Sequence, residues 1–372
     1  MDKRDNAPRS ESASLDTLVL RDQSPSEGPK TGISESAIAT KKQAKAKDYS
    51  HALSSALYAE AIRSDGDQPQ RLGAPKPYER KTMKRAYGRT MDCAKLKVQD
   101  ADGSLRTHYC NSRWCVVCNR IRMAKGIRTY SGWIESIGAE AFFVTLTSEN
   151  CPEQDLLITL QQNVLDFKSC VRSIRRKDKL DFSALRKTEV TYNRGADTYH
   201  PHFHVIVHGE LEAYLLVSYW LKRSHRTTER KAQDVRKLEA TGLKEVMKYS
   251  TKSITKSEAG ERGVHTHSLH VIYTAMKGMK TLQPYGFRLK DFPIIEDEGE
   301  DMNLVNTTTA FKRIGEAVNW EWIPEYQEWV DMETGECLSG YVRSEQMDQI
   351  ISTMKGEKPR PEYPLNEDVL QE

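Results

Sequence analysis

The chain has 372 residues, of which 29% are charged and 38% hydrophobic, and its formal net charge is +3. No apolar run approaches the roughly 20 residues that span a bilayer and no basic-apolar leader opens the sequence, so we expect a soluble, cytoplasmic protein without membrane contacts. The charge is uneven: residues 81–290 hold 37 basic and 21 acidic residues, whereas residues 291–372 hold 6 and 20. A basic body of this kind favours binding to phosphates of nucleic acid.

The first 80 residues are rich in Ser, Ala, Lys and Asp and contain few aromatic residues. Such a segment by itself cannot bury enough apolar surface to offset the entropy lost on ordering. We therefore expect residues 1–80 to be mostly disordered, with one short helix near 48–63.

Clustered cysteines follow in a basic segment, and the chain holds seven cysteines in all. An odd count without a secretion signal argues against disulfides and for metal. Four thiolates would close a tetrahedral structural Zn²⁺ site, which predicts a zinc-binding module over 81–135. The four are Cys93, Cys110, Cys115 and Cys118, with His108 as a substitute for Cys93 and buried free thiols as the alternative to a metal site. The basic run 120–128 is either a contact to a phosphate backbone or an exposed helix.

The next segments alternate between strand and helix patterns. Hydrophobic periodicity predicts, in chain order, a strand at 141–147, a helix at 154–176, a hairpin of strands 185–193 and 200–208, a helix at 213–223, a strand at 232–238 and a helix at 243–254. This order indicates an α+β fold, with helices packed on one face of an antiparallel sheet.

Histidines concentrate on the second strand of the hairpin. The period-two alternation of a strand places His200, His202, His204 and His208 on one face, while the apolar residues between them face a core. Two imidazoles two residues apart can bind a divalent cation. The alternative is a solvated strand face that happens to be rich in histidine.

A third ligand is expected from the preceding strand. If the turn is centred near 196–197, Glu189 lies opposite His204 or one residue away. One carboxylate beside two imidazoles suits Mg²⁺ or Mn²⁺ with positions left open for a phosphate oxygen. His200 is the alternative third ligand, and a register slip of one residue would turn Glu189 away from the site.

The helix predicted at 243–254 carries reactive groups on one face. Glu245, Tyr249 and Lys252 are spaced i, i+4 and i+7. A phenolate is a good nucleophile at phosphorus when a metal polarises the phosphate, and a glutamate one turn away can act as general base. Lys252 can lower the pKa of the tyrosine or hold a phosphate oxygen. Without the histidine strand, the same face would indicate only a solvated helix surface.

The C-terminal part, residues 291–372, is predicted to be a separate acidic region. It opens with the acidic run 296–301 and continues into an aromatic hairpin between Trp320 and Tyr341. Ahead of it, His265 and His267 are assigned to a loop, and a helix is predicted to begin at His270.

Three segments, 143–147, 200–205 and 245–252, resemble in order the motifs of the HUH endonucleases, above all those of plasmid rolling-circle replication initiators with one catalytic tyrosine. The resemblance covers about residues 90–290. It implies a five-stranded antiparallel sheet of the ferredoxin or RRM type, with a nicking and joining domain at 136–290. His202 and His204 would be the metal pair, and Tyr249 the nucleophile that stays attached to the 5′ phosphate.

In initiators with two tyrosines the second lies one helical turn from the first, and Glu245 holds that position here. The resemblance therefore implies termination by glutamate-assisted hydrolysis. It further implies single-stranded DNA at a plasmid origin hairpin as substrate, and we expect a host helicase and DNA polymerase as partners. Two alternatives remain: a single-tyrosine HUH transposase, and a zinc-stabilised DNA-binding regulator without enzymatic activity.

Overall fold

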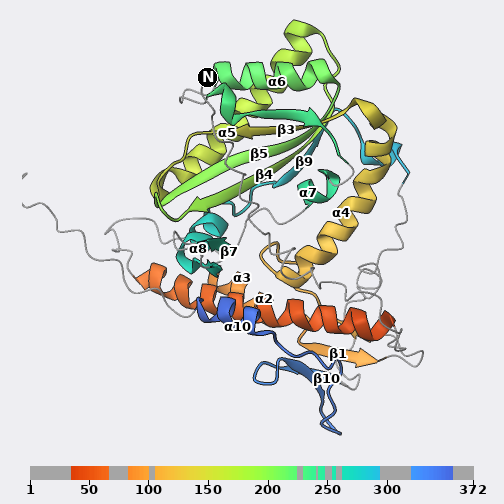
Figure 1. The fold of residues 1–372 in the computed structure, drawn as a ribbon, viewed down its shortest axis with the longest axis vertical. Helices are drawn as coiled ribbons and strands as arrows, with labels where there is room; N and C mark the ends of the chain where they lie inside the picture. Colours follow the sequence, from red (N-terminus) through yellow and green to blue (C-terminus); the bar gives the residue numbers. More distant parts are fainter. Residues whose placement is uncertain are drawn as a thin grey trace, which may run out of the picture.

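The computed structural model describes residues 35–66, 83–99, 105–223, 229–239, 242–247, 254–256, 262–293 and 320–354. Two lobes are visible in Figure 1: a sheet lobe, and a second lobe gathered around the long helix α2 (Glu35–Gly66). We call the second one the cysteine lobe, because Cys93, Cys110, Cys115 and Cys118 lie in its hydrophobic cluster. Within the described ranges, no helix combines the length and the apolar character that a membrane crossing would need.

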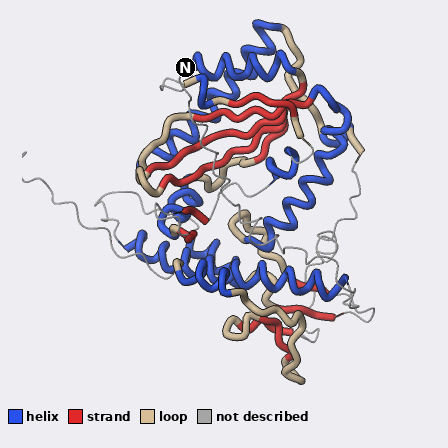
Figure 2. Tube along the Cα trace, in the orientation of Figure 1, coloured by secondary structure: helices blue, strands red, loops and turns tan. Residues whose placement is uncertain are grey.

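The sheet lobe contains a five-stranded antiparallel sheet, drawn in red in Figure 2. Its strand order is β6-β3-β5-β4-β9, and every neighbouring pair is antiparallel. The bounds are β3 (Ala141–Thr147), β4 (Ala184–Asn193), β5 (Thr198–His208), β6 (Asp234–Lys237) and β9 (Leu282–Tyr285). The predicted α+β class and antiparallel sheet are confirmed, and β5 lies at the centre.

The β4–β5 hairpin has a register that differs from the predicted one. Glu189 pairs with His202, not with His204 or its neighbour. The turn is stabilised by Asn193 Oδ1, which accepts hydrogen bonds from two backbone amides at 3.1 and 3.3 Å, and by Asp197 at a φ of 48°. Its centre therefore lies one residue earlier than expected, which shifts the partner by two residues and keeps Glu189 on the same face.

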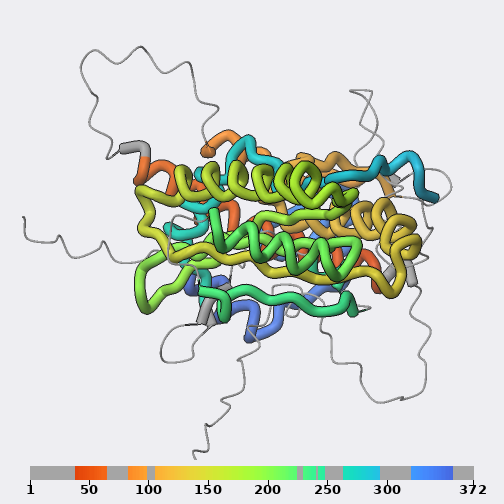
Figure 3. Tube along the Cα trace, turned by 90° about the horizontal axis from the view of Figure 1, so that it is seen from above, coloured from red at the N-terminus to blue at the C-terminus, as the bar shows by residue number. Residues whose placement is uncertain are grey.

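Helices cover both faces of the sheet, so the prediction of helices on one face is wrong. The helices α5 (Leu156–Ser173) and α6 (Glu210–Arg223) pack on one face, and Figure 3 shows them side by side over the sheet. On the other face, α4 (Val116–Ile137) and α7 (Gly242–Met247) pack together over Phe143, Leu185 and Ile206. These strand residues make one end of the second face apolar, and the histidines occupy the rest of it.

Two helix boundaries differ from the sequence predictions. Ile254, predicted to end a helix, begins the short strand β7 (Ile254–Lys256), which pairs with β8 (Arg262–Val264); the β-branched pair at 254–255 favours this conformation. The helix α8 (Thr266–Ala275) starts before His270, because His265 acts as its N-cap and accepts a hydrogen bond from the Ser268 amide at 3.2 Å. The loop prediction is therefore wrong for His267, which lies within the helix, whereas His265 lies in the connection between β8 and α8.

The helix expected near 48–63 is confirmed, but it is longer than predicted: α2 spans 35–66, so the expectation of disorder is wrong for 35–47 and 64–66. Tyr49, Leu53, Leu57 and Ala61 recur every four residues and are almost fully buried. They pack in one cluster with α3 (Met83–Met91), α8 and α10 (Glu345–Ser352). The partners of α2 lie far away in sequence. The composition of this segment alone therefore predicts less buried apolar surface than α2 has in the structure.

The described residues 320–354 of the C-terminal segment pack in the cysteine lobe. The predicted aromatic hairpin is confirmed as β10 (Trp320–Ile323) and β11 (Glu328–Asp331). β10 pairs with β1 (Leu96–Gln99), which pairs with β2 (Leu105–Thr107), in a second antiparallel sheet. Arg343 also binds Asp48 of α2, with Nη2 2.6 Å from Oδ1. The acidic run 296–301 lies outside the described residues.

His267 connects three parts of the molecule and gives a pH-dependent stability. Its Nδ1 lies 2.8 Å from Glu60 of α2, and its Nε2 lies 2.9 Å from Glu153 before α5. The hydrogen bond with Glu153 outweighs burial and, together with Glu60, raises the pKa of His267 from 6.5 to about 9. Because the folded-state pKa is the higher one, this stabilisation is complete below about pH 6.5 and is lost as the pH rises through about 9.

We expect His267→Gln to lower the melting temperature by about 2 to 4 °C at pH 6, corresponding to about 1 kcal/mol for a partly exposed charged pair. The difference between parent and variant should vanish above pH 9.5. Thermal unfolding from pH 5.5 to 10 measures it, with His208→Gln, at an exposed position at the end of β5, as the matched control. A difference that stays constant across this range would contradict the assignment.

Candidate functional site

A buried group of three ligand-bearing side chains lies on the second face of the sheet. Glu189, His202 and His204 each offer one ligand atom, and these atoms all lie within 4.8 Å of one another. Glu189 is 5% exposed and His202 8%, and the His204 side chain is 15% exposed. The pairing of Glu189 with His202 across the strands, and the period-two spacing of the histidines, bring the three together.

The ring orientation of His202 leaves one nitrogen available to a metal. Its Nδ1 lies 3.1 Å from the carbonyl oxygen of His200. A carbonyl can only accept, so Nδ1 carries the proton and Nε2 has a free lone pair. Burial lowers the pKa of His202 to about 3, a little offset by Glu189, so the ring is neutral at physiological pH, as a metal ligand must be.

The carboxylate of Glu189 is held in its charged form. Burial alone would raise its pKa, but Lys187 and then the hydrogen bond with His204 outweigh this and hold the pKa well below its usual range. The distances from Glu189 Oε2 are 3.5 Å to Lys187 Nζ and 3.4 Å to His204 Nε2. Lys187 was not among the predicted site residues, although strand alternation places it on the same face as Glu189.

The neighbouring strands complete the surroundings of the site. On β3, Thr145 pairs with His204, and its Oγ1 lies 3.5 Å from the Nδ1 of that ring. On β6, Arg236 lies 4.6 Å from the ring centroid of Phe143 and forms an ion pair of 3.2 Å with Glu245 of α7. Glu245 therefore lies over the edge strand next to β3, on the face that carries the histidines.

The remaining predicted site residues are two histidines of β5 and two residues that follow the described part of α7. His200 is half-buried and stacks on His202 with ring centroids 5.1 Å apart, but it is not part of the three-residue group. His208 is exposed at the far end of β5. Tyr249 and Lys252, predicted on the helix face with Glu245, lie outside the described residues, since the described part of α7 ends at Met247.

Four buried cysteines form a second group in the cysteine lobe, and all four are free thiols. Their sulfur atoms lie within 4.8 Å of one another, which fits the tetrahedral donor set of a structural zinc ion or a similar metal. The group is Cys93, Cys110, Cys115 and Cys118, as the spacing predicted. The backbone carbonyl of His108 accepts a hydrogen bond from the Ala94 amide, and its side chain is not in the group.

Backbone amides surround these sulfur atoms in a way that favours thiolates. The amides of Cys110, Ser112 and Cys118 lie 3.5, 3.4 and 3.4 Å from the Sγ atoms of Cys93, Cys110 and Cys115. In addition, Cys115 is the N-cap of α4, where the helix dipole stabilises negative charge. The group is therefore built to hold negatively charged sulfur and a cation.

The basic run 120–128 lies in the N-terminal half of α4 and is not uniformly exposed. Arg120 is 7% exposed, and its Nη1 donates to the carbonyl of Lys42 in α2 at 3.0 Å. Arg122 is exposed, and it donates to the carbonyl of Asn111 at 3.0 Å. Part of the run therefore joins α4 to α2, so the alternative of a wholly exposed helix is wrong.

Comparisons with known proteins agree on one family. A family model described as "Replication protein" matches residues 104–330. A "Protein rep" of Streptococcus pneumoniae serotype 2 is 34% identical over 122 residues, which cover 30% of this chain and 37% of that protein. A second "Protein rep", from a Bacillus species, is 28% identical over 134 residues, which cover 33% of this chain and 39% of that protein. A third, from Staphylococcus aureus, is 23% identical over 163 residues, which cover 42% of this chain and 66% of that protein. The matches thus span less than two fifths of the first two relatives. No solved structure matches the chain.

Proposed function

The chain belongs to the replication-protein family, and from this premise we propose that it is a plasmid rolling-circle replication initiator that nicks one strand of DNA. The observation that carries the proposal is the buried group of Glu189, His202 and His204 on the central strands of the sheet. A replication protein with a preformed site for a divalent cation has the means to activate a DNA phosphate. The substrate proposed is single-stranded DNA at the origin hairpin, and a host helicase and polymerase would then continue replication.

The chain's residues fit a hard divalent cation. His202 and His204 supply two imidazoles, and Glu189 supplies the one carboxylate, a set suited to Mg²⁺ or Mn²⁺. When bound, such an ion polarises a phosphate oxygen and lowers the barrier to attack on phosphorus. Thr145 and the carbonyl of His200 orient the two rings, and Lys187 keeps Glu189 charged.

Tyr249 is proposed as the nucleophile. Its phenolic oxygen would form a bond to phosphorus while the bond from phosphorus to the 3′ oxygen breaks, leaving a 5′-phosphotyrosine and a free 3′ hydroxyl that primes synthesis. Lys252 would stabilise the phenolate or a phosphate oxygen. Glu245 would act as general base on water at termination, and it lies near the edge of the site through its ion pair with Arg236.

The proposal is tested by following covalent attachment to DNA. The protein is incubated with labelled single-stranded oligonucleotides from its origin and Mn²⁺, and a denaturant-resistant protein–DNA adduct is expected. Tyr249→Phe should form none, because phenylalanine has no oxygen to bond to phosphorus. Tyr326→Phe is the matched control, since Tyr326 is 68% exposed in the β10–β11 hairpin of the cysteine lobe.

Equal adduct formation by Tyr249→Phe and the parent would refute the role of Tyr249. Absence of any adduct with the parent, together with tight origin binding, would instead support the DNA-binding regulator stabilised by zinc. Adducts formed with the ends of a mobile element, and not with a plasmid origin, would support the HUH transposase.

A further inference from the structure

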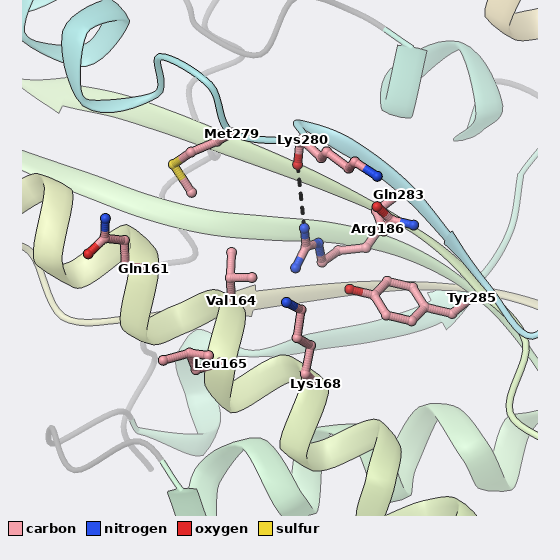
Figure 4. Close-up of a pocket in the computed structure, with 9 residues that line it drawn as sticks. All are labelled: Gln161, Val164, Leu165, Lys168, Arg186, Met279, Lys280, Gln283 and Tyr285. Carbon is pink, nitrogen blue, oxygen red and sulfur yellow. Dashed lines mark hydrogen bonds between the residues drawn. The ribbon is translucent and has the colours of Figure 1, made fainter. Parts of the chain in front are cut away.

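A pocket of about 570 Å³ lies on the face of the sheet opposite to the histidines. It is bordered by α5, by the edge strand β9 and by the segment between α8 and β9 (Figure 4). Val164 and Met279 provide apolar walls, and the cationic lining residues are Lys168, Arg186 and Lys280. None of its nine lining residues is an aspartate or glutamate. The lining of the pocket is therefore positively charged and contains no carboxylate that would neutralise this charge.

Arg186 at the base of this pocket has unused hydrogen-bond donors. The residue is 2% exposed, and its buried Nε and Nη1 have no hydrogen-bond partner. Nη2 has one long contact, 3.5 Å to the carbonyl oxygen of Lys280. A guanidinium remains charged in proteins and carries five N–H groups, so leaving it buried in this state is costly unless an acceptor is supplied. Among the described residues no carboxylate pairs with it.

Three aromatic rings surround the guanidinium. Its central carbon lies 5.3 Å from the ring centroid of Phe167, 4.8 Å from that of Phe203 and 5.8 Å from that of Tyr285. Cation–π contacts of this kind attract the positive charge but supply no oxygen acceptor, so Nε and Nη1 remain without a hydrogen-bond partner. Burial lowers the pKa of Arg186, which is the direction expected for a cation without an anionic partner.

Two further donors converge on the same point. Figure 4 shows the amino group of Lys168 and the hydroxyl of Tyr285 turned toward the guanidinium of Arg186. The Tyr285 hydroxyl is buried and has no hydrogen-bond partner either. Two cations and a hydroxyl, with no anionic acceptor among them, form a site for an oxyanion.

We propose that this pocket binds the phosphate group of a nucleotide, either a free one or one within a DNA strand. The guanidinium edge of Arg186 would hold two phosphate oxygens, and Lys168 and Tyr285 would bind the third side. Val164 and Met279 leave apolar surface for a sugar or base next to it. Because Arg186 and Glu189 lie on opposite faces of β4, this site is separate from the proposed nicking centre and does not depend on its activity.

The test measures phosphate binding without nicking. Isothermal titration without divalent metal uses three probes: inorganic phosphate, dAMP and a 12-nucleotide single strand unrelated to any origin. Lys168→Gln should weaken at least one probe about tenfold, the effect of losing one charge-assisted hydrogen bond. Tyr285→Phe should weaken the same probe to a smaller extent. Lys177→Gln is the matched control, since Lys177 is exposed just beyond α5 and outside the pocket.

The pattern of results identifies the source of the phosphate. Weakened binding of dAMP or inorganic phosphate supports a free nucleotide, and weakened binding of the single strand alone supports a DNA backbone. Binding of all probes that is equal in Lys168→Gln, Tyr285→Phe and Lys177→Gln would overturn the proposal, as would a parent protein that binds none of them. Arg186→Met is a further variant if it folds; the two rim variants keep the test valid if it does not.

Discussion

The His204→Ala variant is expected to nick origin DNA about 10³-fold more slowly than the parent and to bind Mn²⁺ at least about 100-fold more weakly. Removing one imidazole leaves Glu189 and His202 as the only members of the group, which is too few to hold a hard cation at low concentration. Without a bound metal, the charged transition state would lose several kcal/mol of stabilisation. Each 1.36 kcal/mol corresponds to a factor of ten in rate. Metal titration measures binding directly, so a folding defect and a metal defect are distinguishable.

His200→Ala is the matched control for this prediction. It removes an imidazole from the same face of the same strand, but the three-residue group does not include it, and the contact it makes to His202 Nδ1 comes from its backbone carbonyl. We expect near-parental Mn²⁺ affinity and nicking. If both histidine variants lose metal to the same extent, His200 is a ligand and the assignment of the group is incomplete. If neither loses it, the metal lies elsewhere.

The metal group was partly predictable from the sequence because a strand has a strict period of two. That period alone placed His202 and His204 on one face, and it needed no knowledge of the fold. The pairing with Glu189 was not predictable to the residue, because it depends on where the turn is centred. Asn193 caps this turn and Asp197 adopts a left-handed conformation there, and neither feature follows from composition. The error of two residues left the face unchanged and therefore the group intact.

The length of helix α2 was underestimated for a different reason. The stabilisation of a helix in a protein comes mostly from the surface that it buries against other elements, not from its own propensity. Here the partners of Asp48 and Glu60 are Arg343 and His267, more than 200 residues away. Similarly, the acidic composition of 291–372 suggested a separate region, whereas the pairing of β10 with β1 brings the described residues 320–354 into the cysteine lobe. A window along the sequence contains no information about such contacts.

The double variant Cys115→Ser, Cys118→Ser is expected to lose one zinc ion per chain and to destabilise the cysteine lobe by several kcal/mol. Structural zinc sites contribute on the order of 10 kcal/mol or more in small domains, and the apolar cluster of this lobe would offset only part of the loss. Both cysteines lie in that cluster together with α2 and α8. Metal analysis, thermal unfolding and limited proteolysis measure the effect, with cleavage expected first in α2 and at the start of α4.

Cys337→Ser controls for the loss of a thiol, because Cys337 is exposed and lies outside the four-cysteine group. It should keep the parental zinc content and melting temperature. A double variant that retains its zinc would exclude the four-cysteine site. One that loses zinc without losing stability would show that the ion does not stabilise the cysteine lobe. The expected result instead ties zinc to the position of α4, whose N-terminus carries Cys115 and Cys118 and whose far end packs beside α7. Loss of zinc should therefore also reduce nicking, in a protein whose Mn²⁺ affinity is unchanged.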